Sequence, residues 1–237
     1  AFTNAKITKA LITTFKYAFI TVPLKLIFAL FIAYILNFKI ACVNLFRTIY
    51  YIPSILGGSV AIAVLWKAVF RDDGLVNTLI RMITFGHAQG PSWLSDPIKA
   101  FWALIIVTVW QLSGYLMLIY IAGLMGVSDD LKEAAKIDGC DEKKTTRYIT
   151  LPMMAGTFTI CFFLAITRAF VTYDVNISLT EGGPYGSITL AAMYVYNMAF
   201  SSKKYGLGQA EALILFLVIA IIAVTQAFIG KSKEVEA

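Results

Sequence analysis

The sequence predicts an all-α integral membrane protein, a bundle of about five transmembrane helices joined by polar connections. Hydrophobic residues make up 59% of the 237 residues and the mean hydropathy is +0.77, whereas soluble domains are about 45–50% apolar. The apolar residues are gathered into runs close to the ~20 residues that cross a hydrocarbon core. Within lipid such runs must be helical, because backbone polar groups there are satisfied only internally.

Five apolar runs are long enough to cross a membrane. The first run contains Pro23, which lacks a backbone N–H and predicts either a kink or a local break in that helix. The polar connections between the runs hold most of the charged residues. The predicted spans are Leu11–Leu36, Thr48–Phe70, Lys99–Met125, Met153–Leu179 and Leu207–Ile229.

Lysines and arginines in the connections predict the orientation of the bundle, since cytoplasmic loops carry an excess of positive charge. The formal net charge of +6 comes mainly from these flanking residues, so it does not indicate a nucleic-acid partner. The bias is modest. It places residues 128–152 and the C-terminus in the cytoplasm and the start of the sequence outside.

The outer connection between the second and third spans contains the stretch VNTLIRMITFG, beginning at Val76. Its apolar residues fit a short amphipathic helix at the membrane interface, and plain loop packing is the alternative. Trp93 suits an aromatic belt. The pair Asp96-Pro97 is typical of a turn, so we expect the third span to begin just after it.

Residues 128–152 form the most polar long segment, and their pattern predicts helix, elbow and helix. Ser128 is suited to cap a helix that has acidic residues in its first turn. Gly139 is suited to end that helix in the left-handed conformation. Asp141 is suited to cap a second short helix, and Pro152 to begin the next span.

The spacing in this segment resembles the EAA loop of binding-protein-dependent ABC importers. We expect a chance match of all seven fixed positions on the order of once in ten million windows, with each residue type below roughly 10% usage. An ordinary solvated loop is the alternative. The matching positions are Glu133-Ala134-Ala135, three residues, Gly139, nine residues, Ile149, one residue, then Leu151-Pro152.

A second stretch, Leu179-Thr180-Glu181-Gly182-Gly183-Pro184, resembles the LT-x-GGP loop of the sugar-importing branch, the maltose and glycerol-phosphate type of permease. The similarity covers nearly the whole chain from Thr13 but lacks the usual first of six spans. Cys140 stands where alanine is more usual, which is a small departure. Downstream, the same branch's pattern is matched by Tyr194, Tyr196, Ala199-Phe200 and Gly206.

The resemblance implies a single permease domain over residues 1–237, with residues 128–152 as its cytoplasmic coupling loop. In this family the loop docks into a groove on a separate ATPase subunit. The implied assembly has a second, homologous permease subunit, two ATPase subunits and an extracytoplasmic solute-binding protein, in the bacterial cytoplasmic (inner) membrane. The expected coupling residues are Glu133, Ala134, Ala135, Asp138, Gly139, Ile149, Leu151 and Pro152.

We predict that the chain is not an enzyme and holds no cofactor. Gly230-Lys231-Ser232 lacks the first glycine of a phosphate-binding loop, because Thr225 occupies that position. His87 is the only histidine, which leaves no histidine pair for zinc and no Ser-His-Asp set. ATP and Mg²⁺ are therefore expected on the partner ATPase subunits.

The resemblance also implies a substrate pathway, because maltose-type permeases line a central cavity from the spans that flank the EAA loop. Hydroxyl, amide and aromatic side chains there suit a sugar. A guanidinium would favour a carboxylate or phosphate, which gives the hypothesis of an acidic sugar. For each position, ordinary packing is the alternative. The expected pathway residues are Thr108, Gln111, Tyr115, Arg168 and Thr172.

Lys25 and Asp174 also lie within apolar runs, where ionisable groups are costly and often functional. A buried Lys25–Asp174 ion pair between helices is the structural alternative.

Two other classes of protein fit an apolar helical bundle. A secondary transporter of a small polar solute is the main rival. Such a transporter would show an internal repeat, and we find no convincing repeat in this sequence. A membrane-embedded enzyme would need a catalytic set, which the sequence does not offer.

Overall fold

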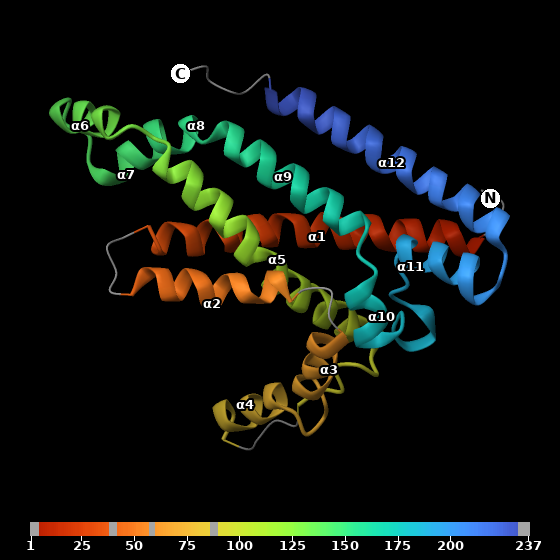
Figure 1. The fold of residues 1–237 in the computed structure, drawn as a ribbon. Helices are drawn as coiled ribbons and strands as arrows, with labels where there is room; N and C mark the ends of the chain where they lie inside the picture. Colours follow the sequence, from red (N-terminus) through yellow and green to blue (C-terminus); the bar gives the residue numbers. More distant parts are fainter. Residues whose placement is uncertain (1–4, 38–41, 57–59, 86–89, 232–237) are drawn as a thin grey trace.

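The computed structural model describes residues 5–37, 42–56, 60–85 and 90–231, and every regular element within them is a helix. The fold class is thus confirmed (Figure 1). The longer helices are α1 (Ala5–Ile35), α2 (Val43–Ile55), α3 (Val60–Val69), α4 (Leu75–Ile83), α5 (Pro97–Met125), α6 (Asp129–Ile137), α9 (Ala155–Phe170) and α12 (Tyr205–Lys231). The shorter elements are α7 (Glu142–Thr145), η1 (Thr146–Thr150), α8 (Leu151–Met153), α10 (Asp174–Thr180), η2 (Pro184–Gly186), α11 (Ala191–Tyr196) and η3 (Asn197–Ser201).

The core of the bundle lies where α1, α5 and α9 pack against one another, with α12 along α9 and α2 along α5. Small side chains at these contacts, such as Ala33, Ala165 and Ala169, are fully buried. In membranes small residues let helices approach closely, and this packing supports association there. Figure 1 shows α6 and α7 at one end of the bundle, with the starts of α1 and α12 at the other.

Three described helices are long and apolar enough to cross a membrane, namely α1, α5 and α12. A fourth span is formed if the bent pair of residues 142–153 and 155–170, which meet at 65°, is taken as one. The first, third and fifth predicted spans are therefore found. Pro23 lies inside α1 without ending it, so the local break allowed by the sequence does not occur.

The second predicted span, Thr48–Phe70, is wrong as a single helix. It is divided into the end of α2 and the whole of α3, and each of these two helices is too short to cross a bilayer. Residues 57–59, which separate them, lie outside the described residues. Their sequence is Gly-Gly-Ser. After proline, glycine is the least favourable residue in the interior of a helix.

The fourth predicted span, Met153–Leu179, is wrong at both ends. At its start the chain bends at Met154, between α8 and α9. At its end α9 stops at Phe170, and α10 begins at Asp174 as a separate short helix. The Thr172 hydroxyl donates to the Arg168 carbonyl at 2.8 Å, and such local hydrogen bonds compete with helix continuation.

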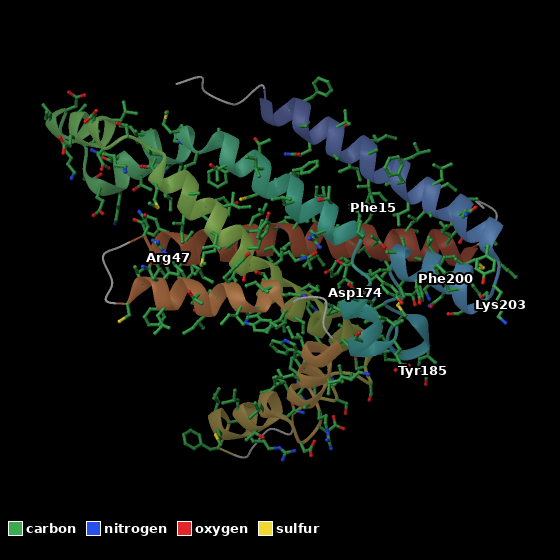
Figure 2. The ribbon with its side chains drawn as sticks, in the orientation of Figure 1. Phe15, Arg47, Asp174, Tyr185, Phe200 and Lys203 are labelled. Atoms are coloured by element: carbon green, nitrogen blue, oxygen red, sulfur yellow. The ribbon has the colours of Figure 1, made fainter. Side chains whose placement is uncertain are left out.

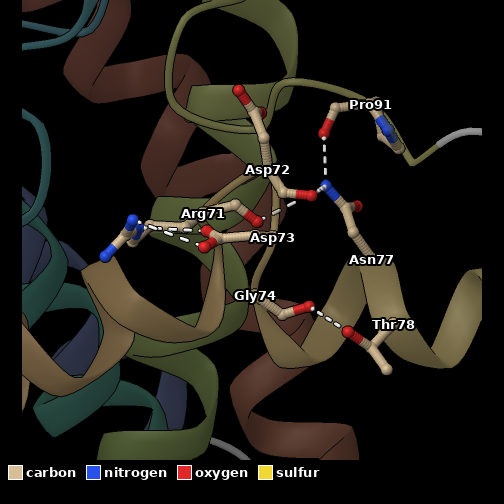
Figure 3. Close-up of polar contacts among 7 residues, drawn as sticks. All are labelled: Arg71, Asp72, Asp73, Gly74, Asn77, Thr78 and Pro91. Carbon is tan, nitrogen blue, oxygen red and sulfur yellow. Dashed lines mark hydrogen bonds and ion pairs between the residues drawn. The ribbon is translucent and has the colours of Figure 1, made fainter.

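Helix α4 confirms the predicted outer helix, although its place at a membrane interface stays a prediction. Asn77, buried on α4, ties this region together (Figure 3). Its Nδ2 donates to the carbonyls of Arg71, Asp72 and Pro91, and its Oδ1 accepts from Trp93 Nε1 at 2.9 Å. Trp93 is therefore a packing and hydrogen-bonding partner of α4.

We expect Asn77→Ala to loosen this outer loop, because it removes the side-chain partner of Trp93 and of the Pro91 carbonyl. Each buried group left without a partner costs about 1–3 kcal/mol. Hydrogen-exchange mass spectrometry should show faster exchange over residues 90–95. Thr78→Ala, which removes one hydrogen bond to the carbonyl of Gly74 at the start of α4, is the matched control with little effect. Equal exchange in both variants would contradict the role given to Asn77.

Candidate functional site

A polar cavity of about 420 Å³ lies in the bundle between α1, α2, α5 and the junction of α9 with α10. All five residues predicted for the substrate pathway line it: Thr108, Gln111, Tyr115, Arg168 and Thr172. The structure thus brings together positions that lie up to 64 residues apart in the sequence. Their role in transport stays a prediction at this point.

Helix periodicity explains the α5 wall of the cavity. Thr108, Gln111 and Tyr115 are three and four residues apart, so they share one face of the helix. The Thr108 hydroxyl is held in place, since it accepts from Tyr17 Oη at 2.9 Å and donates to the Leu104 carbonyl at 2.9 Å. Thr108 therefore offers less free hydrogen-bonding capacity than its residue type suggests.

Close approach of α2 to α5 forms the second wall. A Cβ atom at Gly114 would lie against the backbone carbonyl of Tyr50, well inside van der Waals contact. Only glycine permits this distance, and it brings Tyr51 and Ser54 of α2 to the cavity. At its other end α2 is fixed by Arg47, whose guanidinium donates to the Leu36 carbonyl at 3.1 Å (Figure 2).

The end of α9 forms the third wall. Because the helix stops at Phe170, the chain turns there and places Thr172, Tyr173 and Asp174 along the cavity beside Arg168. Figure 2 shows Asp174 at the start of α10. Trp110, which precedes Gln111 in the sequence, is not a lining residue and packs edge-on against Trp66, with ring centroids 5.2 Å apart.

Several lining residues were missing from the predicted pathway. Lys25 and Asp174 carried a signal, because both are ionisable residues within apolar runs. Tyr51 and Ser54 carried none, since the pathway prediction used only the spans around the EAA loop. The Lys25–Asp174 ion pair allowed as an alternative is wrong: both residues line the cavity, but neither forms an ion pair with a described residue.

The polar segment at residues 128–152 has the predicted caps and elbow. Ser128 Oγ accepts from Asp130 N, and Asp141 Oδ1 accepts from Lys144 N at 2.8 Å. Gly139 has φ +80°, and two hydrogen bonds close α6 there: Gly139 N to Lys136 O and Cys140 N to Ala135 O. This pair of bonds is a Schellman motif, which requires the left-handed conformation that glycine adopts readily.

A charge pair marks the start of this segment. Lys132 Nζ lies 2.9 Å from Asp129 Oδ1. The hydrogen bond and charge of Lys132 lower the pKa of Asp129 from its ordinary value. Both side chains are near solvent, so the pair contributes little stability.

The predicted coupling residues do not all share one surface. Glu133, Ala134, Asp138, Gly139 and Pro152 are exposed, and Ile149 and Leu151 are half-buried. Ala135 is only 4% exposed and lies in the interior of the segment, so it is unavailable to a partner. Three exposed apolar side chains were not predicted there: Leu131 is 41% exposed, Ile137 is 86% exposed and Tyr148 is 68% exposed.

The second helix of the segment, which the sequence predicts to run through Tyr148, continues to Met153. After α7 a π-helical turn, Thr146–Thr150, leads into α8, with Leu151 N donating to the Thr146 carbonyl. Pro152 follows Leu151 directly and has no backbone N–H to donate. The π-helical turn therefore comes immediately before a residue that cannot take part in the backbone hydrogen bonding of an α-helix. The bend of 65° at Met154 then separates the segment from α9.

Comparison with known proteins identifies the family. The model of the family described as "Binding-protein-dependent transport system inner membrane component" matches residues 1–234. The chain belongs to this family. It is a family of transport permeases, so the cavity and the polar segment lie in a transport protein and not in a catalytic one.

Individual relatives agree with this assignment. The probable starch degradation products transport system permease protein of Thermoanaerobacterium thermosulfurigenes is 35% identical over 233 residues, covering 98% of this chain and 78% of the relative. The trehalose/maltose transport system permease protein of Thermococcus litoralis is 28% identical over 222 residues, covering 93% and 74%.

A solved structure shares the fold. The crystal structure of a bacterial ABC transporter involved in the import of the acidic polysaccharide alginate matches with a TM-score of 0.85. The match covers 97% of this chain and 80% of that chain, at 19% sequence identity. At that identity the likeness establishes the fold alone.

Proposed function

We propose that this permease is one transmembrane subunit of an ATP-driven importer for a sugar or oligosaccharide and that it forms half of the translocation pathway. The observation that carries the proposal is the cavity, where hydroxyl, amide and aromatic groups of three helical walls converge. Such a mixture suits sugar hydroxyls and ring faces. Relatives named for starch degradation products and for trehalose/maltose support a sugar as cargo.

The proposed assembly contains a second homologous permease, two ATPase subunits and an extracytoplasmic binding protein in the cytoplasmic (inner) membrane. In it, ATP and Mg²⁺ are bound by the ATPase subunits. The exposed part of residues 128–152 docks on one ATPase subunit, with Glu133 available for a basic partner. The solved transporter that was crystallised with its alginate pentasaccharide-bound periplasmic protein supports a binding-protein partner.

The source of energy tests this proposal. The complete assembly is reconstituted in proteoliposomes. Its binding protein is added on the extracytoplasmic side of the membrane, and ATP with Mg²⁺ is supplied on the side of residues 128–152. We expect uptake of the sugar that the binding protein retains, and no uptake with a non-hydrolysable ATP analogue. Uptake driven by a proton or sodium gradient without ATP would instead favour a secondary transporter.

The charge of the cavity favours one class of cargo. Arg168 lines the cavity and forms no ion pair with a described residue. A free guanidinium is suited to a carboxylate or phosphate. We therefore propose an acidic sugar as the cargo, a hypothesis that the sequence already suggested.

A further inference from the structure

Lys25 is the most unusual polar residue of the cavity. It lies on α1, ten residues before the end of the helix at Ile35, and the residue is only 2% exposed. It nevertheless lines the cavity. Its ammonium lies 5.6 Å from the centroid of the Tyr17 ring and forms no hydrogen bond or ion pair with any described residue.

An ammonium group in this position is costly unless something balances it. A charged side chain inside a membrane span is disfavoured, and such residues almost always pair or face a water-filled cavity. The cation–π contact with Tyr17 offsets only part of the loss of hydration. Lys25 is therefore a buried cation that is directed into a cavity and lacks an anion.

The other charges that face this cavity do not neutralise it. Among the described residues, α9 contributes Arg168, α10 contributes Asp174, and α2 and α5 contribute only neutral groups. Asp174 pairs with neither cation. The cavity therefore has a net positive charge, formed by two cations on different helices and one carboxylate.

We propose that Lys25 is a specificity-determining residue that, together with Arg168, recognises a carboxylate on the transported sugar. This inference rests on the proposed function, and it names the substrate class as uronate-containing oligosaccharides. Asp174 favours a carboxylate over a phosphate monoester, because a single negative charge suits a cavity with an excess of one positive charge. A phosphate monoester carries −1.5 to −2 near neutral pH and is repelled more strongly by Asp174.

Direct binding to the transmembrane assembly tests the role of Lys25, because the binding protein would otherwise select the sugar. The complete assembly without its binding protein is placed in lipid nanodiscs. Equilibrium binding is measured with a tetrasaccharide that contains one uronate unit, a neutral tetrasaccharide of the same linkage and a sugar phosphate. We expect the wild type to bind the uronate more tightly than either other probe.

Substitutions at Lys25 test whether its positive charge causes the preference for the uronate. We expect Lys25→Met to weaken uronate binding about tenfold or more, as for loss of a charged hydrogen-bond partner, with neutral binding unchanged. Lys25→Arg should keep most of the preference. Lys16→Met, an exposed lysine on the same helix, is the control and should leave all three affinities unaltered.

Three results would overturn the inference: no uronate preference in the wild type, an unchanged preference in Lys25→Met, or tighter binding of the sugar phosphate. If Lys25→Met lowers the melting temperature of the assembly, the Lys25→Arg variant decides, since loss of the preference there contradicts the role of charge. ATP-driven sugar uptake is measured separately in proteoliposomes. A negative result in the binding experiment would therefore contradict the role of Lys25 without contradicting the proposed function.

Discussion

Gly139→Glu should abolish ATP-driven uptake while the subunit still inserts into the membrane. Gly139 has φ +80° and closes α6, and a non-glycine residue in that conformation costs about 1 kcal/mol or more. A Cβ atom there would meet no described atom within 4 Å, so the chain itself has room for the side chain. The expected damage is therefore to the elbow and to the surface that we propose docks on the ATPase.

The matched variant Gly139→Asn separates these effects. Asparagine tolerates the left-handed conformation better than other residues with a side chain, so the elbow should persist and uptake should largely survive. Both variants are assayed for sugar uptake, ATPase stimulation and membrane content of the subunit. Normal uptake by Gly139→Glu would contradict a mechanical role for the elbow.

Gly114→Leu should prevent stable assembly of the bundle. The added side chain would collide with the Tyr50 backbone, which cannot rotate away as a side chain does. Overpacking typically costs 1–3 kcal/mol, and a backbone collision lies at the upper end of that range or above it. Separation of α2 from α5 would also remove Tyr51 and Ser54 from the cavity.

Thermal unfolding in detergent and the yield of membrane-inserted protein measure this effect. Gly126→Ala is the control, because a Cβ atom at that end of α5 makes only ordinary contacts at 3.5 Å. We expect a large loss of stability for Gly114→Leu and almost none for Gly126→Ala. Similar melting temperatures for the two variants would mean that α2 does not depend on Gly114.

The parts of the fold that were predictable from sequence are those determined locally. Long apolar runs predict α1, α5 and α12, because lipid requires helix wherever such a run crosses it. Caps such as Ser128 and Asp141 and the elbow at Gly139 follow from hydrogen bonds within a few residues. These features need no knowledge of the rest of the chain.

Interruptions inside apolar runs were not predictable in the same way. Helix α9 ends at Phe170 because the chain turns at Val171–Tyr173. The hydropathy pattern does not show this turn, since the predicted span runs through it. The bend at Met154 and the π-helical turn before Pro152 depend on how the segment packs at the end of the bundle. Hydropathy along the chain measures affinity for lipid and does not measure where the helix axis changes direction.

Some residues of the candidate site were predictable from the sequence, and others depend on tertiary contacts. The five pathway positions came from a family resemblance, and the structure places all of them on one cavity. Tyr51 and Ser54 join them only because Gly114 admits α2, which is a tertiary contact without a local signal. Ala135 fits the sequence pattern, yet it is buried because α6 packs on the α7–η1 part of the same segment.

Site-directed cross-linking tests whether residues 128–152 contact an ATPase that drives transport. A single cysteine replaces the exposed Ala134 in a background in which Cys42 and Cys140 are changed to serine and the buried Cys161 is kept. A short bifunctional reagent is then added to the purified assembly. We expect a cross-linked product that contains this permease and the ATPase subunit, and we expect its yield to change when ATP is bound. Absence of any product with the ATPase, while the cysteine reacts freely with a soluble thiol reagent, would contradict it.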